Sequence, residues 1–192
     1  MELRDYVRVL AKHWLAIVVV TVLVTGAVAT WTFLQPKAYT ATAQMFVAIS
    51  SRSDSGDPTT GATYTMQRIT SYVQLIDSPQ VLQPVIDELG LDVDVKHLGD
   101  DVSATNPIDT VLINVSASNQ SAEQAAKIAN AAAVQLGAVI QALESSAAGD
   151  VVPVKATLTD PAEAPTSPSS PRTRINLFLG VLVGLALGVG YA

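Results

Sequence analysis

The stretch that decides the fold is DPAEAPTSPSSPRTRINLFLGVLVGLALGVGYA, from Asp160 to Ala192. It divides into a proline-rich part and an apolar part. Because proline fixes φ and lacks a backbone N–H, residues 160–174 are expected to form an extended, semi-rigid spacer. The run 175–192 carries no charge, which predicts a membrane helix. The prolines of the spacer are Pro161, Pro165, Pro168 and Pro171.

The apolar run carries a stripe of glycines. Gly180, Gly184 and Gly188 are four residues apart and therefore share one face of a helix. Small residues on one face let a second membrane helix come close. The second helix can be the other span of the same chain or belong to a neighbouring subunit. Residues 175–192 would rise only about 27 Å, against a hydrocarbon core of about 30 Å, so we expect a helix cut near its inner end.

A second apolar run lies near the N-terminus. Residues 1–13 read as a short amphipathic lead, and residues 14–34 contain no charged side chain. Trp14 and Trp31 lie near the ends of this run, where indole rings favour the membrane interface. The run therefore predicts a first transmembrane helix. The alternative is a cleaved signal peptide, because Ala27-Val28-Ala29 is a small-x-small sequence behind a basic lead.

Basic residues flank the two spans on both sides. Residues 1–13 carry Arg and Lys side chains, whereas the segment between the spans begins near Lys37 and ends with Arg172 and Arg174. The two sides of the spans therefore carry equal numbers of basic residues. In such proteins the first helix usually determines the orientation. We expect both chain ends in the cytoplasm and residues 38–159 in an extracytoplasmic domain.

The segment between the spans reads as an α+β domain. Apolar and polar residues alternate in 39–49, 111–118 and 152–158, which predicts strands. Helical patterns occupy 63–77, 79–89 and 121–144, with a short turn of helix near 94–99. The first strand follows one span and the last precedes the other, so we expect the two to be antiparallel neighbours. The predicted fold is a small antiparallel or mixed sheet with covering helices, carried by two transmembrane helices.

The composition argues against several classes of activity. The chain of 192 residues has no cysteine, two histidines and a net charge of −6, which disfavours thiolate sites, histidine-based metal centres and nucleic-acid binding. Residues 56–63 nearly fit a phosphate-binding loop, but Ala62 stands where the lysine is needed. The acidic clusters do not match a calcium loop. We expect no catalytic residue, no metal and no cofactor.

Two polar residues of the predicted helices are candidates for contacts. Asn130 lies in the alanine-rich helix, either exposed or with its amide tied to a neighbouring backbone. Arg68 lies on the first helix of the domain, either solvated or facing a partner subunit. We expect these two residues as candidate subunit contacts.

The chain resembles the polysaccharide co-polymerases, or chain-length determinant proteins, of bacterial surface polysaccharide synthesis. The resemblance covers essentially the whole chain. It rests on segments near both spans and inside the domain, above all on the proline-rich segment that runs into the second span. These segments are YVRVLAKHW, YTATAQMFV, SYVQLIDSPQVLQPVIDELGL, SAEQAAKIANA and DPAEAPTSPSSPRTRINLFLGVLVGLALG.

The resemblance implies a ring-like homo-oligomer in the plasma or inner membrane. Its outer domains would stand over the polysaccharide polymerase and bias the length of the growing glycan. It also implies partnership with a bacterial tyrosine kinase in the cytoplasm. The matching positions are the four prolines of the spacer, Asn176 at the start of the second span, and the three glycines of the stripe. The domain is short beside family members with a long helical hairpin, so a tall assembly is not implied.

The sequence therefore predicts a non-enzymatic membrane protein that regulates the length or export of O-antigen, capsule or exopolysaccharide. One alternative is a transmembrane activator of a tyrosine kinase, with the kinase in a separate chain or beyond Ala192. A third is an anchored adhesin or solute-binding module, which would be a monomer in detergent.

Overall fold

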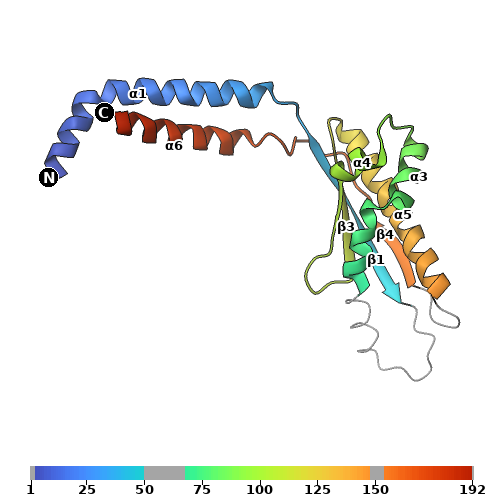
Figure 1. Cartoon of the computed structure of the whole chain (residues 1–192). Coiled ribbons are helices and arrows are strands. Elements are labelled where there is room, and N and C mark those ends of the chain that lie inside the picture. Colours follow the sequence, from blue (N-terminus) through green and yellow to red (C-terminus); the bar gives the residue numbers. More distant parts are fainter. Residues whose placement is uncertain (1–2, 50–67, 148–153, 192) are drawn as a thin grey trace. The chain divides into compact units, whose positions relative to one another are not determined.

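The computed structural model describes residues 3–49, 68–147 and 154–191. The chain divides into two compact units: Met1–Lys37 with Ser169–Ala192, and Ala38–Pro168. The first unit is a pair of apolar helices and the second is a mixed α+β domain (Figure 1). The predicted fold class is confirmed. The phosphate-loop-like stretch 56–63 and the expected start of a helix at 63–67 lie outside the described residues.

The domain contains a sheet of four strands in the order β2-β3-β1-β4. All neighbours are antiparallel, and β1 pairs with β4 from Ile49 opposite Val154 to Gln44 opposite Asp160. The predicted antiparallel pairing of the first and last strands is confirmed. The edge strand β2 was not predicted from the sequence. The strands are β1 (Tyr39–Ile49), β2 (Val102–Thr105), β3 (Leu112–Asn119) and β4 (Val154–Asp160).

The helices of the domain follow the predicted pattern, and the helix predicted over 79–89 has the predicted ends. Residues 68–73 are helical and continue into the 3-10 helix η1 (Gln74–Asp77). Ser78 occupies the N-cap position of the next helix, although its hydroxyl makes no capping hydrogen bond. Gly90 ends that helix with a φ of 60°, a conformation that glycine adopts without strain. The remaining helices are α3 (Pro79–Leu89), α4 (Val95–Asp101) and α5 (Ala122–Ala147).

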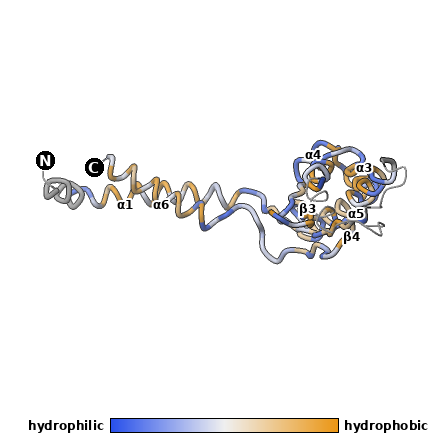
Figure 2. The backbone as a smooth tube through the Cα atoms, turned by 90° about the horizontal axis from the view of Figure 1, so that it is seen from below, coloured by the Kyte–Doolittle hydropathy of each residue, from blue (hydrophilic) through white to orange (hydrophobic). Residues whose placement is uncertain are grey.

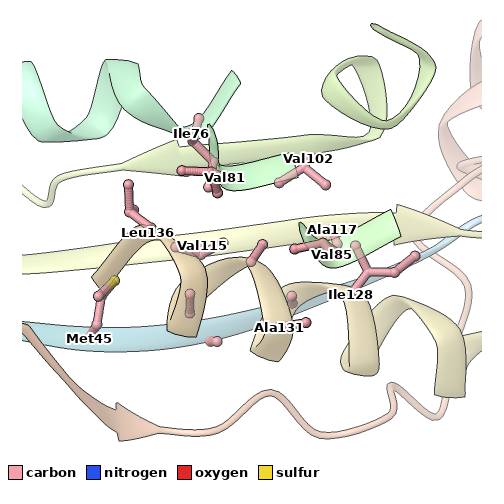
Figure 3. Packing of buried hydrophobic residues seen from close by; sticks show 14 of the residues in the cluster. Met45, Ile76, Val81, Val85, Val102, Val115, Ala117, Ile128, Ala131 and Leu136 are labelled. Atoms are coloured by element: carbon pink, nitrogen blue, oxygen red, sulfur yellow. The ribbon is translucent and has the colours of Figure 1, made fainter. Parts of the chain in front are cut away.

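The core lies between one face of the sheet and the helices. Figure 3 shows α5 lying along the strands, with Leu136 and Ala131 on the helix and Met45 and Val115 on the sheet in the same layer. The alanines of α5 allow the helix backbone to come close to the strands. A side chain at Gly137 would touch the Met45 side chain at 3.4 Å. The inward face of β1, predicted from its alternation, is buried at Ala41, Ala43, Met45 and Val47.

The other unit consists of α1 (Leu3–Leu34) and α6 (Thr173–Tyr191). The amphipathic lead and the apolar run form one helix, interrupted only by a non-helical backbone at His13. Figure 2 shows that apolar residues occupy most of the length of α1 and α6. Within the described residues, three helices are long and apolar enough to cross a membrane: α1, α5 and α6. The apolar face of α5 is used in the domain core, which leaves α1 and α6 as candidate spans.

Candidate functional site

The glycine stripe of α6 lies against α1 of the same chain. A Cβ at Gly180 would lie 3.2 Å from Val28 Cβ, and one at Gly188 would lie 3.0 Å from Ile17 Cα. The closest approach is at Gly184, where an added Cβ would lie 2.8 Å from Thr21 Cα. The two helix backbones can approach this closely only because α6 has no side chains here. Of the two partners that the sequence left open for the stripe, the structure shows the span of the same chain.

A polar pair lies at the end of this contact where α6 begins. The Asn176 side chain donates a hydrogen bond to Thr32 Oγ1 at 3.3 Å. Thr32 is 1% exposed and is the buried polar residue of α1. A hydrogen bond between two apolar helices fixes their register, because an unpaired amide in lipid would be costly. Asn176 and the glycine stripe together therefore define one helix hairpin.

The proline-rich spacer is attached to the domain at its first residues. Asn130 of α5 donates from Nδ2 to the Ala162 carbonyl at 3.0 Å, and its Oδ1 accepts from the Ala162 N–H at 2.7 Å. Ala162 follows Pro161 and is 7% exposed. A single amide thus satisfies both backbone groups of a residue that belongs to no strand. The alternative in which the Asn130 amide ties its helix to a neighbouring backbone is confirmed, whereas its role as a subunit contact stays a prediction.

Replacing Asn130 with alanine is expected to destabilise the domain by about 1–3 kcal/mol, because the N–H and the carbonyl of the buried Ala162 both lose their partner. Calorimetry of the purified full chain measures this as a lower unfolding temperature. Gln141→Ala is a matched control, since this amide of the same helix makes only an exposed 3.4 Å contact with the Ala156 carbonyl. Equal effects of the two substitutions would contradict the attachment.

Arg68 lies in a cluster with a tyrosine and a glutamate. Its guanidinium and the Tyr72 hydroxyl both donate to Glu144 Oε1, the latter at 2.8 Å. The cluster joins the helical residues 68–73 to the end of α5. Burial, together with the hydrogen bond to the Glu144 carboxylate, raises the pKa of Tyr72 to about 12. Arg68 is thus engaged inside its own chain, and its role at a subunit contact stays a prediction.

The tyrosine predicts a dependence of stability on alkaline pH. Because the folded state raises the Tyr72 pKa from 10.0 to about 12, this contribution is complete below pH 10 and is lost as pH rises through about 12. Between these values the unfolding temperature of the wild type should fall more steeply than that of Tyr72→Phe. Parallel slopes of the two proteins in a thermal scan across this range would refute the prediction.

The face of the sheet opposite the core carries a ladder of polar side chains. Thr40 bonds to Ser118 and Thr42 to Ser116, each at 2.9 Å, and Gln44 donates to Asn114 Oδ1 at 2.9 Å. This ladder was not predicted from the sequence, although polar residues alternate along both strands. The hydroxyls and amides of this ladder are hydrogen-bonded to one another across β1 and β3. In the part of the chain that the structure describes, no group of acidic or histidine side chains could hold a metal ion.

Comparison with known proteins agrees with this geometry. A family model described as "Chain length determinant protein" matches residues 1–89, which include α1, β1 and α3. Residues 1–89 thus resemble the Wzz family. The family resemblance predicted from the sequence is therefore confirmed. The description of the family model names a determinant of chain length and no reaction.

Two curated relatives match most or all of the chain. The "Capsular polysaccharide biosynthesis protein CpsC" of Streptococcus pneumoniae is 28% identical over 183 residues, covering 93% of this chain and 75% of the relative. The "Probable capsular polysaccharide biosynthesis protein YwqC" of Bacillus subtilis is 29% identical over 193 residues, covering 100% of this chain and 75% of the relative. Both alignments therefore extend well beyond residues 1–89.

Proposed function

We propose that this protein regulates the length of a bacterial surface polysaccharide as a membrane-bound, non-catalytic co-polymerase. The observation that carries the proposal is the match of the whole chain, hairpin and domain together, to proteins of capsular polysaccharide biosynthesis. The site supports the same role, because it consists of packing and anchoring contacts rather than reactive groups. Capsule, O-antigen and exopolysaccharide are all glycans on which such a protein can act.

The proposed mechanism uses the hairpin and the spacer to position the domain. The stripe and the Asn176–Thr32 hydrogen bond hold α1 and α6 in one register. Asn130 holds the start of the spacer on the domain, and Pro165, Pro168 and Pro171 restrict the chain beyond it. Copies of the protein, with Arg68 and Asn130 near their contacts, would form an oligomer that keeps the polymerase or the growing glycan engaged longer. Longer chains are then favoured without any chemical step by this protein.

Deletion of the gene tests the function directly. The surface glycan of the deletion strain should shift to a shorter or broader size distribution, visible on a gel of the purified polysaccharide. The wild-type gene supplied in trans should restore the original distribution. An unchanged distribution in the deletion strain would refute the role.

The partners are proposed to be further copies of the chain, the polysaccharide polymerase and a cytoplasmic tyrosine kinase. Cross-linking in cells followed by mass measurement of the solubilised complexes tests the oligomer and the polymerase together. If instead the protein acts through the kinase alone, changes in the domain should not alter glycan length in cells whose kinase activity is held constant. A monomer in detergent would favour the adhesin alternative over both.

The domain is proposed to lie outside the cell. Because the chain has no cysteine, a single introduced thiol reports its side of the membrane. Thr157→Cys, at an exposed position of β4, should react with a membrane-impermeant maleimide in intact cells. Lys12→Cys, exposed near the other end of α1, should react only after lysis. The reverse pattern would place the domain in the cytoplasm and remove it from the growing glycan.

A further inference from the structure

The hairpin carries a group of cations that neither its packing nor its orientation explains. These are Lys37, after the end of α1, and Arg172 and Arg174, at the start of α6. Asn176 lies against Thr32 and Gly180 against Val28, so the helices are antiparallel and residues near 172 lie level with residues near 36. The three side chains, here called the basic collar, therefore belong to one end of the hairpin.

The collar has no acidic counterpart within its unit. All three side chains are exposed. In Met1–Lys37 and Ser169–Ala192 the acidic residues are Glu2 and Asp5, at the opposite end of α1. Three positive charges at the edge of a membrane helix pair strongly attract anions, because the field is screened only over a Debye length of about 10 Å.

Aromatic and aliphatic side chains border the collar on the membrane side. Trp31 and Phe33 are each 72% exposed and Leu34 is 77% exposed. An indole ring and long apolar side chains next to cations match the boundary between acyl chains and head groups. The surface offers apolar contact to acyl chains and, one step further along the axis, positive charge to a phosphate.

The sidedness of the collar also calls for an explanation. If the domain lies outside the cell, these cations lie on the side where membrane proteins carry fewer of them. The collar has as many basic residues as residues 1–13. It therefore does not favour the proposed orientation of the helices. A role in binding explains why basic residues lie at this end of the hairpin, although basic residues are favoured on the cytoplasmic side.

We propose that Lys37, Arg172 and Arg174 form a binding surface for the phosphate-bearing head groups of anionic lipids in the leaflet at this end of the hairpin. The ligand is a lipid with net negative charge rather than a zwitterionic one, because the collar offers cations and no carboxylate. Bound lipid would hold the end of the hairpin, and with it the spacer, at a fixed depth. The inference depends on membrane insertion of α1 and α6 and not on the glycan role.

Quenching of tryptophan fluorescence by brominated lipid tests lipid binding at the collar. The chain has two tryptophans, so Trp14→Phe leaves Trp31 as the single reporter. The full-length variant is placed in vesicles that contain either phosphatidylglycerol or phosphatidylcholine brominated near the head group. Quenching should show a preference for the anionic lipid of about threefold to tenfold, falling as salt rises from about 0.1 M to about 1 M.

Two triple variants that remove the same charge, one in the collar and one in the domain, test whether the collar causes the lipid preference. Lys37→Gln, Arg172→Gln and Arg174→Gln together should bring the preference close to one. Lys96→Gln, Lys127→Gln and Lys155→Gln, at exposed positions of the domain, remove the same charge and should leave it unchanged. No anionic preference in the parent, or a preference that survives loss of the collar, would overturn the proposal. Glycan length in cells is measured separately, so failure of the lipid surface and failure of the proposed function can be told apart.

Discussion

Replacing Gly184 with leucine is expected to separate α1 from α6. Even the first added carbon would lie 2.8 Å from Thr21 Cα and 3.1 Å from the Thr21 carbonyl oxygen. Both atoms belong to the backbone, so the helices have to move apart, and forced overpacking of this kind typically costs about 1–3 kcal/mol or more. Because Gly180 and Gly188 also lie against α1, we expect the packing along the whole hairpin to loosen.

A cysteine pair measures the separation. The chain has no native cysteine, and the Thr32 and Asn176 side chains lie 3.3 Å apart at their polar atoms. In a Thr32→Cys, Asn176→Cys background, oxidation followed by cleavage inside the domain should leave the two fragments joined. Gly184→Leu should lower the yield of the joined product about tenfold. Cross-linked dimers in place of joined fragments would instead assign the stripe to a contact between subunits.

Gly26→Leu is the matched control for this experiment. It adds the same side chain to the middle of a membrane helix, but a Cβ at Gly26 meets nothing within 4 Å. The yield of joined fragments should therefore stay at the level of the background. If both glycine variants lowered the yield equally, the loss would come from leucine in the span and not from the close approach at Gly184. In cells, Gly184→Leu should shift glycan length toward the deletion phenotype, while Gly26→Leu should not.

The sequence was sufficient to predict elements whose apolar pattern is regular. The alternation of Tyr39–Ile49 predicted β1 with its observed ends, and the span order predicted its antiparallel pairing with β4. Strand β2 was not predicted because Val102–Thr105 is only four residues long and is positioned by pairing with β3. Short edge strands depend on their neighbours rather than on their own pattern.

Contacts between distant residues were the part that sequence could not supply. The spacing of the glycines predicted a close helix contact, but not that Thr21 and Ile17 would form the opposing surface. The polar ladder of the sheet became visible only with the register, since Thr40 and Ser118 are 78 residues apart. Asn130 could be recognised as unusual within an alanine-rich helix, yet its partner at Ala162 depends on how the chain leaves β4.

Replacing Leu136 with alanine is expected to cause a large loss of stability in the domain. Leu136 lies on α5, is fully buried and belongs to the layer that joins the helix to the sheet (Figure 3). Truncation removes buried carbon atoms and leaves a cavity, because the flanking alanines are too small to fill it. Such substitutions destabilise by about 2–5 kcal/mol, or roughly 8–20 °C in unfolding temperature for a domain of this size.

Leu143→Ala makes the same chemical change on the same helix, where the side chain is 44% exposed. Calorimetry of both full-length variants should give a shift for Leu143→Ala that is less than about a third of the shift for Leu136→Ala, because little buried surface is lost. The comparison also bears on the role of α5, which is apolar enough to cross a membrane. If α5 were a lipid-facing span, truncation at the two positions would have similar small effects. A large and selective effect at Leu136 follows only if the helix is the core element that holds the sheet, the Asn130 contact and the spacer together.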